Sequence, residues 1–150
     1  MKLDKKQILE YQRNKDPYLM IDHADSVIPG VSAEGYKNLT EKDWFFKCHW
    51  QGDPNMPGML QIEALVQMAA LAIVTLPGKK GRVLYITSAS NLQFKKKILI
   101  GDKLIIKTKI LNYKRGIANC TATGTVKDVL ACKAEFNLID PIEMQKFNVG

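Results

Sequence analysis

The sequence lacks the cysteine patterns of a disulfide scaffold or a thiolate metal site. It has three cysteines, Cys48, Cys120 and Cys132, with no CxxC spacing and no cluster with His23 or His49. An odd number of cysteines outside a secretory context argues against a disulfide framework. We therefore expect reduced thiols and no metal site.

Long hydrophobic runs, internal repeats and linkers are also missing. The longest uninterrupted apolar run, residues 68–74, has seven residues, whereas a membrane-spanning helix needs about 20. Residues 1–6 do not lead into the apolar core of a signal peptide. These features favour a cytoplasmic protein. The length of 150 residues favours one domain, residues 1–150, with its own core.

The net charge of +7 favours acidic partners in general, whether nucleic acid, anionic lipid or an acidic protein. Lys and Arg are spread along the chain, and the one dense run is Lys95, Lys96 and Lys97. No recognised nucleic-acid-binding motif accompanies them. A solvated surface explains most of these charges, and an acidic carrier protein would use them equally well.

One long apolar helix is the clearest element. Residues 58–75 are apolar almost all round, so we expect this helix to be buried on nearly every side. Pro57 suits its start, because the missing N–H would have no partner there. The sequence Leu76-Pro77-Gly78 ends it.

Around this helix the pattern predicts a short helix and several strands. After the helix, the period of the apolar residues changes from about 3.6 to 2, and short connections imply antiparallel neighbours. The predicted class is α+β, an antiparallel sheet of five or six strands wrapped around one long central helix. An edge strand or an open helix side would need a partner chain to cover it. The predicted helix covers residues 5–12, and the predicted strands cover 18–28, 32–38, 82–94, 103–113, 116–127 and 129–138.

Glu63 lies in the second turn of the apolar helix, between Ile62 and Ala64. Burial disfavours the ionised carboxylate, so the pKa of Glu63 should rise, which makes it a usable acid at neutral pH. Gln67, four residues later, shares its face and can orient it through a hydrogen bond. The alternative is a structural Glu bonded to neighbouring backbone.

His49 precedes a Gly- and Pro-rich turn that leads to the helix. With an unperturbed pKa of about 6.5 it can be a neutral base. Gly58 opens the helix, where unpaired N–H groups and the helix dipole would stabilise a thioester carbonyl as it gains negative charge. A structural His and a glycine that serves only the turn are the alternatives. In an extended segment Cys48 would point away from His49, which argues against a Cys–His dyad.

Residues 44–58, WFFKCHWQGDPNMPG, resemble the active-site motif of bacterial 3-hydroxyacyl-[acyl-carrier-protein] dehydratases. This resemblance implies the hot-dog fold. The sequence Gly52-Asp53-Pro54 resembles the FabA type, which also isomerises the double bond. Glu63 resembles the FabZ type, since the FabA type has Asp there. Isomerase activity is therefore left open, whereas both residues required for dehydration are present.

The resemblance also implies a site shared by two subunits, in a homodimer or a trimer of dimers. His49 of one chain would remove the α-proton, and Glu63 of the other would protonate the departing β-hydroxyl. Gly58 would bind the thioester carbonyl, and Gln67 would complete the substrate-binding site beside Glu63. The product would be a trans-2-enoyl thioester, with no metal or redox cofactor.

The implied partner is an acidic acyl carrier protein that delivers the acyl group on its phosphopantetheine arm. Lys95, Lys96, Lys97 or Arg82 are candidate docking charges. Two alternatives remain at this point: a hot-dog thioesterase, and a non-catalytic acyl-binding or subunit-stabilising module. The acyl chain length is also open, although apolar helix residues such as Val66 could line a tunnel.

Overall fold

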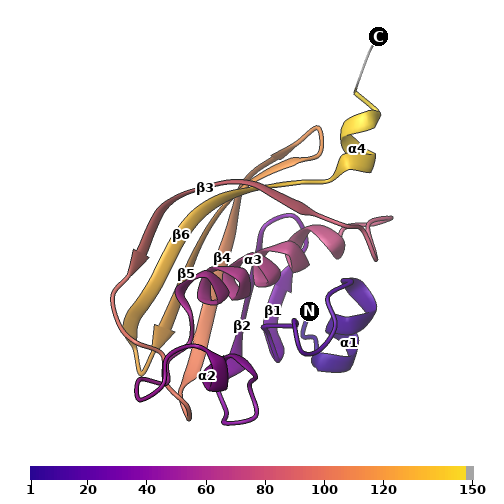
Figure 1. Cartoon of the computed structure of the whole chain (residues 1–150). Helices are drawn as coiled ribbons and strands as arrows, with labels where there is room; N and C mark the ends of the chain where they lie inside the picture. Colours follow the sequence, from indigo (N-terminus) through magenta and orange to yellow (C-terminus); the bar gives the residue numbers. More distant parts are fainter. Residues whose placement is uncertain (148–150) are drawn as a thin grey trace.

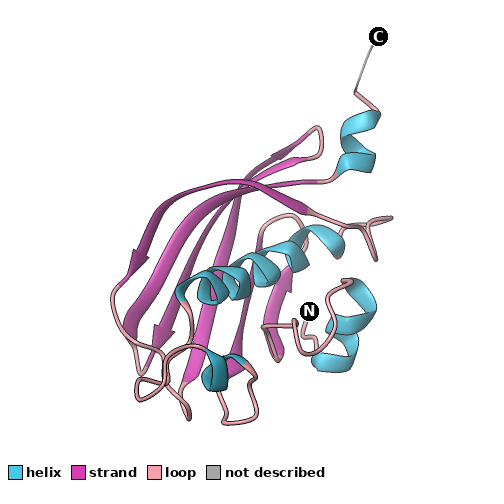
Figure 2. Ribbon diagram, viewed as in Figure 1, coloured by secondary structure: helices cyan, strands magenta, loops and turns pink. Residues whose placement is uncertain are grey.

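The computed structural model describes residues 1–147, so the last three residues of the expected domain lie outside the described residues. Figures 1 and 2 show one long helix lying across a curved sheet. The helices are α1 (Lys5–Tyr11), α2 (Phe45–Cys48), α3 (Gly58–Val74) and α4 (Pro141–Gln145). The strands are β1 (His23–Ile28), β2 (Ser32–Asn38), β3 (Tyr85–Phe94), β4 (Lys103–Lys114), β5 (Ile117–Val126) and β6 (Val129–Ile139).

The six strands form one antiparallel sheet in the order β1-β2-β4-β5-β6-β3. Helix α3 packs on one face of this sheet, mainly against β2, β4, β5 and β6 and also against β1. This is the predicted α+β layout of a sheet wrapped around a central helix. Within the described residues, no helix has the length and apolar character needed to span a bilayer.

The helix packs closely on the sheet because small residues line the inner face of β5. Ala118, Cys120, Ala122 and Val126 are each at most 2% exposed, as their alternation predicts. At Gly124 a Cβ atom would lie only 2.8 Å from the Cys132 Sγ and 2.8 Å from a Leu104 methyl. Glycine is therefore required where the helix, β4 and β6 converge on β5.

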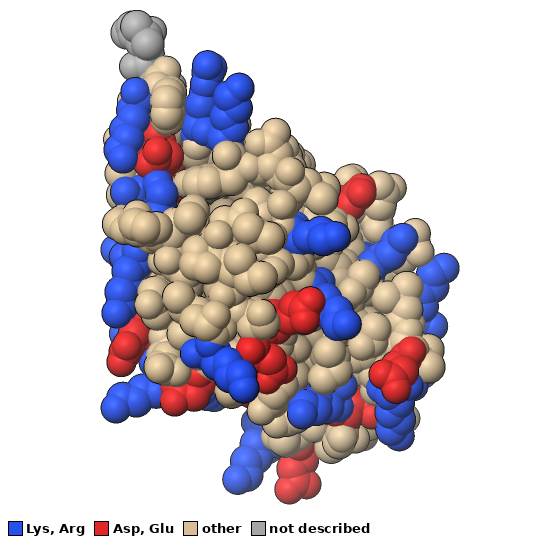
Figure 3. Space-filling model, turned by 180° about the vertical axis from the view of Figure 1, so that it is seen from behind, with Lys and Arg blue, Asp and Glu red and all other residues tan. Residues whose placement is uncertain are grey.

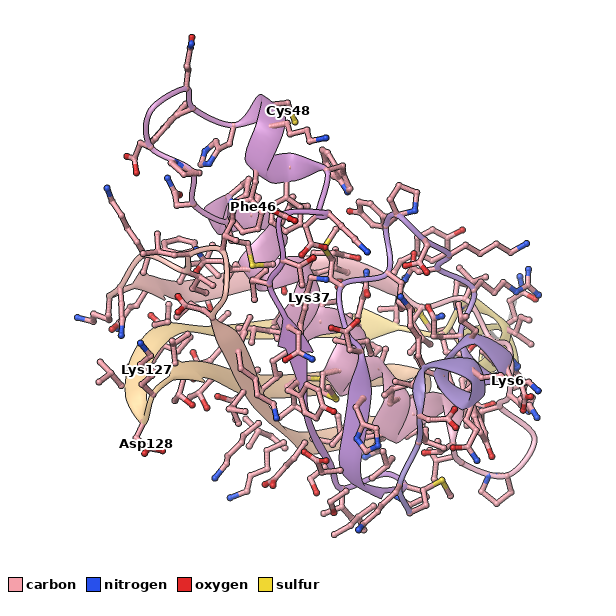
Figure 4. The ribbon with its side chains drawn as sticks, turned by 90° about the horizontal axis from the view of Figure 1, so that it is seen from below. Lys6, Lys37, Phe46, Cys48, Lys127 and Asp128 are labelled. Atoms are coloured by element: carbon pink, nitrogen blue, oxygen red, sulfur yellow. The ribbon has the colours of Figure 1, made fainter. Side chains whose placement is uncertain are left out.

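The two predicted hairpin turns connect β4, β5 and β6. Arg115 and Gly116 have φ of 55° and 81°, and Lys127 and Asp128 have φ of 50° and 64°. Two successive positive φ angles are typical of the type I′ turn, which matches the twist of the strands. Lys127 and Asp128 lie at the tip of their hairpin in Figure 4.

One stripe of α3 is left uncovered, so the prediction of burial on nearly every side was wrong for this face. Met59 is 64% exposed, and Glu63, Val66 and Ala70 are only partly buried. These residues are spaced by four, three and four positions, which places them on one side of the helix. The sheet covers the opposite side and reaches no further. We call these four residues the open stripe.

Strand β3 is an edge strand that, within the described residues, pairs only with β6. Almost all of its residues are exposed. Tyr85, Ile86, Leu92 and Phe94 among them are 37–56% exposed. Unpaired edges with apolar side chains are prone to pair with another chain.

On the face of the molecule seen in Figure 3, the charged residues do not form one dense patch. In Figure 3, which views the molecule from behind, the Lys and Arg side chains are scattered among Asp and Glu. This distribution is consistent with the solvated surface inferred from the sequence.

Candidate active site

His49 lies at the C-terminal end of α2, where its N–H donates to the Phe45 carbonyl at 3.0 Å. Its Nδ1 lies 2.9 Å from the Asn55 carbonyl oxygen. Because a carbonyl only accepts, Nδ1 carries the proton, and Nε2 is left with a lone pair. The imidazole also stacks on Trp50, with ring centroids 4.4 Å apart. When the ring is neutral, the Asn55 carbonyl therefore selects the tautomer that leaves Nε2 as the basic nitrogen.

A network of contacts fixes the loop that carries Asn55. The Lys97 Nζ lies 3.0 Å from both carboxylate oxygens of Asp53, and this hydrogen bond is the main cause that lowers the pKa of Asp53. The Asn55 side chain donates to the Asp53 carbonyl at 2.9 Å. The Met56 N–H donates to the Ile98 carbonyl at 2.8 Å. The segment before β4 therefore supports the segment that orients His49.

Cys48 belongs to α2, so the expectation of an extended segment here was wrong. The chain is helical because the Phe45 carbonyl accepts from His49. The Cys48 thiol lies 3.5 Å from the Trp44 carbonyl oxygen and 3.8 Å from that of Phe45. In Figure 4 Cys48 lies on the outer side of α2 and Phe46 on the side toward the sheet. Within residues 1–147 the thiol makes no hydrogen bond to His49.

Glu63 lies on the open stripe, and burial is the main cause that raises its pKa. The Gln67 Nε2 donates to Glu63 Oε1 at 3.0 Å and partly opposes this rise. This is the hydrogen bond that the i, i+4 spacing predicted. Gln67 is only 3% exposed. It also donates to the Tyr18 carbonyl at 3.0 Å and accepts from the Met20 N–H at 2.7 Å.

Gly58 is the first residue of α3, after Pro57. The N–H groups of Gly58 and Met59 have no acceptor within residues 1–147. A Cβ atom at Gly58 would lie 3.0 Å from the ring of Phe94. Two donors at a helix N-terminus are therefore available to an oxygen that gains negative charge.

A cavity of about 300 Å³ lies beside Glu63, between α3 and the segment that leads into β3. Val66, Ala70 and Val74 line one wall, and Leu84 and Ile86 line the other. Glu63 and Gln67 line this cavity, whereas His49 and Gly58 of the same chain do not. One chain thus brings the carboxyl and its amide to the cavity but leaves the imidazole outside it.

Several contributors could not be found from the sequence. The Asn55 carbonyl is a backbone group, which carries no residue signature. Phe94 packs beside Gly58 only because β3 lies along α3, and Lys97 and Asp53 are 44 positions apart. No group of three or more His, Cys, Asp or Glu within residues 1–147 is arranged to hold a metal ion.

The sheet order, the central helix and the residues at its start define a hot-dog protein. The dehydratase heterocomplex ApeI:P from Xenorhabdus doucetiae has this fold, with a TM-score of 0.76 at 12% identity, covering 93% of this chain and 95% of the other. A hypothetical thioesterase from Streptococcus pneumoniae, solved with coenzyme A, matches with a TM-score of 0.59 at 15% identity, covering 77% and 82%. The fold alone therefore does not separate dehydration from thioester hydrolysis.

Sequence similarity shows to which family of hot-dog proteins the chain belongs. A family model described as a FabA-like domain matches residues 14–135. The 3-hydroxyacyl-[acyl-carrier-protein] dehydratase FabZ of Clostridium novyi is 35% identical over 138 residues, covering 91% of this chain and 97% of the relative. FabZ of Bacillus subtilis is 34% identical over 133 residues, covering 89% and 94%. The chain belongs to the FabA-like family.

Proposed function

We propose that the chain, acting as one domain, dehydrates 3-hydroxyacyl-[acyl-carrier-protein] to trans-2-enoyl-[acyl-carrier-protein]. The observation that carries this function is the difference between two titratable groups. His49 is a base with a free Nε2, and Glu63 is a half-buried carboxyl whose pKa is raised. A basic nitrogen with a free lone pair and a carboxyl whose pKa is raised can supply the base and the acid of an elimination. The curated relatives with the same reaction in their names match nearly their whole length.

The steps follow from these states. The Nε2 of His49 takes the proton from the α-carbon, and the electron pair of that C–H bond forms the α,β double bond. The C–O bond at the β-carbon breaks, and the protonated Glu63 gives its proton to the departing hydroxyl, which leaves as water. The Gly58 N–H donates to the thioester oxygen as it gains negative charge. Transfer of the proton from His49 back to Glu63 through solvent restores both groups.

In a homodimer, the second chain would supply the imidazole that one chain does not bring to the cavity. Strand β3 runs antiparallel to α3, because Phe94 lies beside Gly58 at the start of the helix. Two β3 edges paired around a two-fold axis would bring Gly58 and His49 of one subunit toward Glu63 of the other. The same pairing would cover the open stripe and the exposed side chains of β3.

Mixing two inactive variants tests the shared site. His49→Asn and Glu63→Gln should each abolish enoyl formation while keeping the fold. After the two variants are unfolded together and refolded, heterodimers contain one intact site, so roughly a quarter of the wild-type activity should return. If His49 and Glu63 of the same chain act together, every site in the mixture stays defective and no activity returns.

The assay should monitor both enoyl product and free thiol. Dehydration gives the enoyl thioester without thiol release. Thiol release without enoyl product would identify a thioesterase and refute the dehydratase function. Activity retained in His49→Asn would refute the role of His49.

The substrate requires an acyl carrier protein as partner. The reaction would take place in the cytoplasm and would need no cofactor. Lys95 and Lys96 are the docking charges that remain available, because Lys97 is bonded to Asp53 and Arg82 to Asp140. Exposed charges act mainly on the rate of association. Lys96→Glu should raise KM for the carrier-linked substrate at low salt and leave kcat unchanged.

A further inference from the structure

The cavity beside Glu63 runs along α3, away from the start of that helix. The start of α3 lies at the Phe94 end of β3, and the far end of α3 leads into the loop that carries Arg82. From Glu63 to Val74 the helix rises by about 16 Å, at about 1.5 Å per residue. Apolar side chains line this run. An acyl chain that starts at Glu63 would therefore extend along α3 toward Arg82.

The far end of the cavity is polar. Gln12, Arg13, Asn14 and Arg82 line it, and we call these four residues the polar wall. The Gln12 side chain makes two hydrogen bonds of 2.7 Å with the backbone of Asn14. Its Nε2 donates to the Asn14 carbonyl, and its Oε1 accepts from the Asn14 N–H. The Arg13 Nε donates to the Gly81 carbonyl at 2.8 Å. The segment after α1 is thereby tied to the loop after α3.

Ion pairs with the buried carboxylate of Asp140 hold the Arg82 side chain of the polar wall in place. Two hydrogen bonds of 2.9 and 2.8 Å join Arg82 Nη1 to the carboxylate of Asp140, whose side chain is only 1% exposed. The Lys79 Nζ lies 3.5 Å from the same carboxylate. A hydrocarbon chain that pushed past Arg82 would separate a buried carboxylate from its partner, which is strongly unfavourable.

We propose that the polar wall limits the length of the acyl chain that the site accepts. The inference rests on the dehydratase function proposed above. The cavity has a volume of about 300 Å³, so it holds only a limited length of hydrocarbon before the polar wall. A longer chain would meet charged and amide side chains that are already hydrogen-bonded to other groups of the protein. The enzyme is therefore selective for short and medium chains.

The test measures kcat/KM with carrier-linked 3-hydroxyacyl substrates of four to sixteen carbons. Each methylene that enters the apolar slot should raise kcat/KM about fourfold, from the transfer free energy of a buried methylene. The rise should stop at the length at which the chain reaches the polar wall, and longer chains should react more slowly.

Plug variants locate the limit. Ala70→Phe should shorten the preferred chain more than Val74→Phe, because Ala70 lies one turn, about 6 Å, nearer to Glu63. Val129→Phe, at an exposed position of the β5–β6 hairpin, is the matched control and should keep the wild-type profile. Circular dichroism and the thermal midpoint show that each plugged variant is folded.

The outcomes separate the limit from the reaction. A shift of the preferred length in the order expected for Ala70 and Val74 supports the limit. Normal dehydration with a rate that rises to sixteen carbons, or plugs that leave the length profile unchanged, overturns the limit while the dehydratase function stands. The lack of enoyl product from the wild type at every length overturns the dehydratase function and the limit together.

Discussion

Gln67 joins the acid of the proposed site to the segment before β1, and its replacement by methionine should show both roles. The change Gln67→Met keeps the length of the side chain but removes three hydrogen bonds, to Glu63, Tyr18 and Met20. Met20 is fully buried, so its N–H is left without a partner. That loss costs about 1–3 kcal/mol, and each of the other two bonds contributes about 1 kcal/mol. We expect a loss of about 3–5 kcal/mol in the free energy of unfolding.

Gln61→Met in the same helix is the matched control. Gln61 is also buried, at 5% exposure, but makes one side-chain hydrogen bond, from Nε2 to the Met56 carbonyl at 2.9 Å. Its Oε1 has no partner within the described residues. Its replacement should cost about 1 kcal/mol. Urea unfolding measures both variants, with equal m-values as the condition for comparison.

The pH profile of Gln67→Met gives a second readout. The Gln67 amide lowers the pKa of Glu63, against the effect of burial. Without it the pKa of Glu63 rises further, so the protonated acid persists to higher pH. The alkaline limb of kcat should therefore move to higher pH, while kcat falls because Glu63 is no longer oriented. A Gln67→Met variant no less stable than Gln61→Met, or one whose alkaline limb moves to lower pH, would refute the reasoning.

Three further predictions concern the same site. Glu63→Gln should lower kcat by about 10²–10⁴-fold, yet it should unfold at a higher urea concentration than the wild type at pH 8. The raised pKa of Glu63 means that the fold favours the neutral carboxyl over the carboxylate. The stability advantage of the variant should therefore disappear as the pH falls below about 4.3, the ordinary Glu pKa. Gly58→Ala should keep or raise stability, because alanine is the better helix former by up to about 1 kcal/mol, but should reduce kcat/KM as its methyl meets Phe94; an unchanged kcat/KM would show that the start of α3 does not contact substrate. Asp53→Asn should leave the thermal midpoint unchanged, since the ion pair with Lys97 is exposed. It should lower kcat several-fold, because the loop that orients His49 becomes less fixed. Asp128→Asn is the control, and equal kcat values for the two variants would contradict the role of Asp53 in orienting His49.

The longest and most regular elements could be predicted from sequence. The helix at 58–75 ends one residue early in the structure, and the strand at 32–38 has the predicted bounds. The strand expected from residue 18 begins at His23 instead. In the segment before it, the Tyr18 carbonyl and the Met20 N–H bond to the Gln67 side chain. A tertiary contact of this kind leaves no local pattern.

Two short helices, α2 and α4, were not predicted, because four and five residues are too few to show a period. For α4 a signal was present: Asp140 caps the helix through its carboxylate, and Pro141 follows at the first position. The site could be predicted in part. The residue types and the Glu63–Gln67 spacing are local, whereas the tautomer of His49 depends on a backbone carbonyl across a loop.

The strand order has a consequence for synthesis of the chain. Helix α3 is made before β4, β5 and β6, three of the five strands that it packs against. The hairpin of β1 and β2 must also wait for β4, its only other neighbour in the sheet. A nascent chain that ends before β4 therefore exposes an apolar helix with little to cover it, a state that favours aggregation and chaperone binding. The meander of β4, β5 and β6, joined by two-residue turns, is the part whose emergence from the ribosome completes the core.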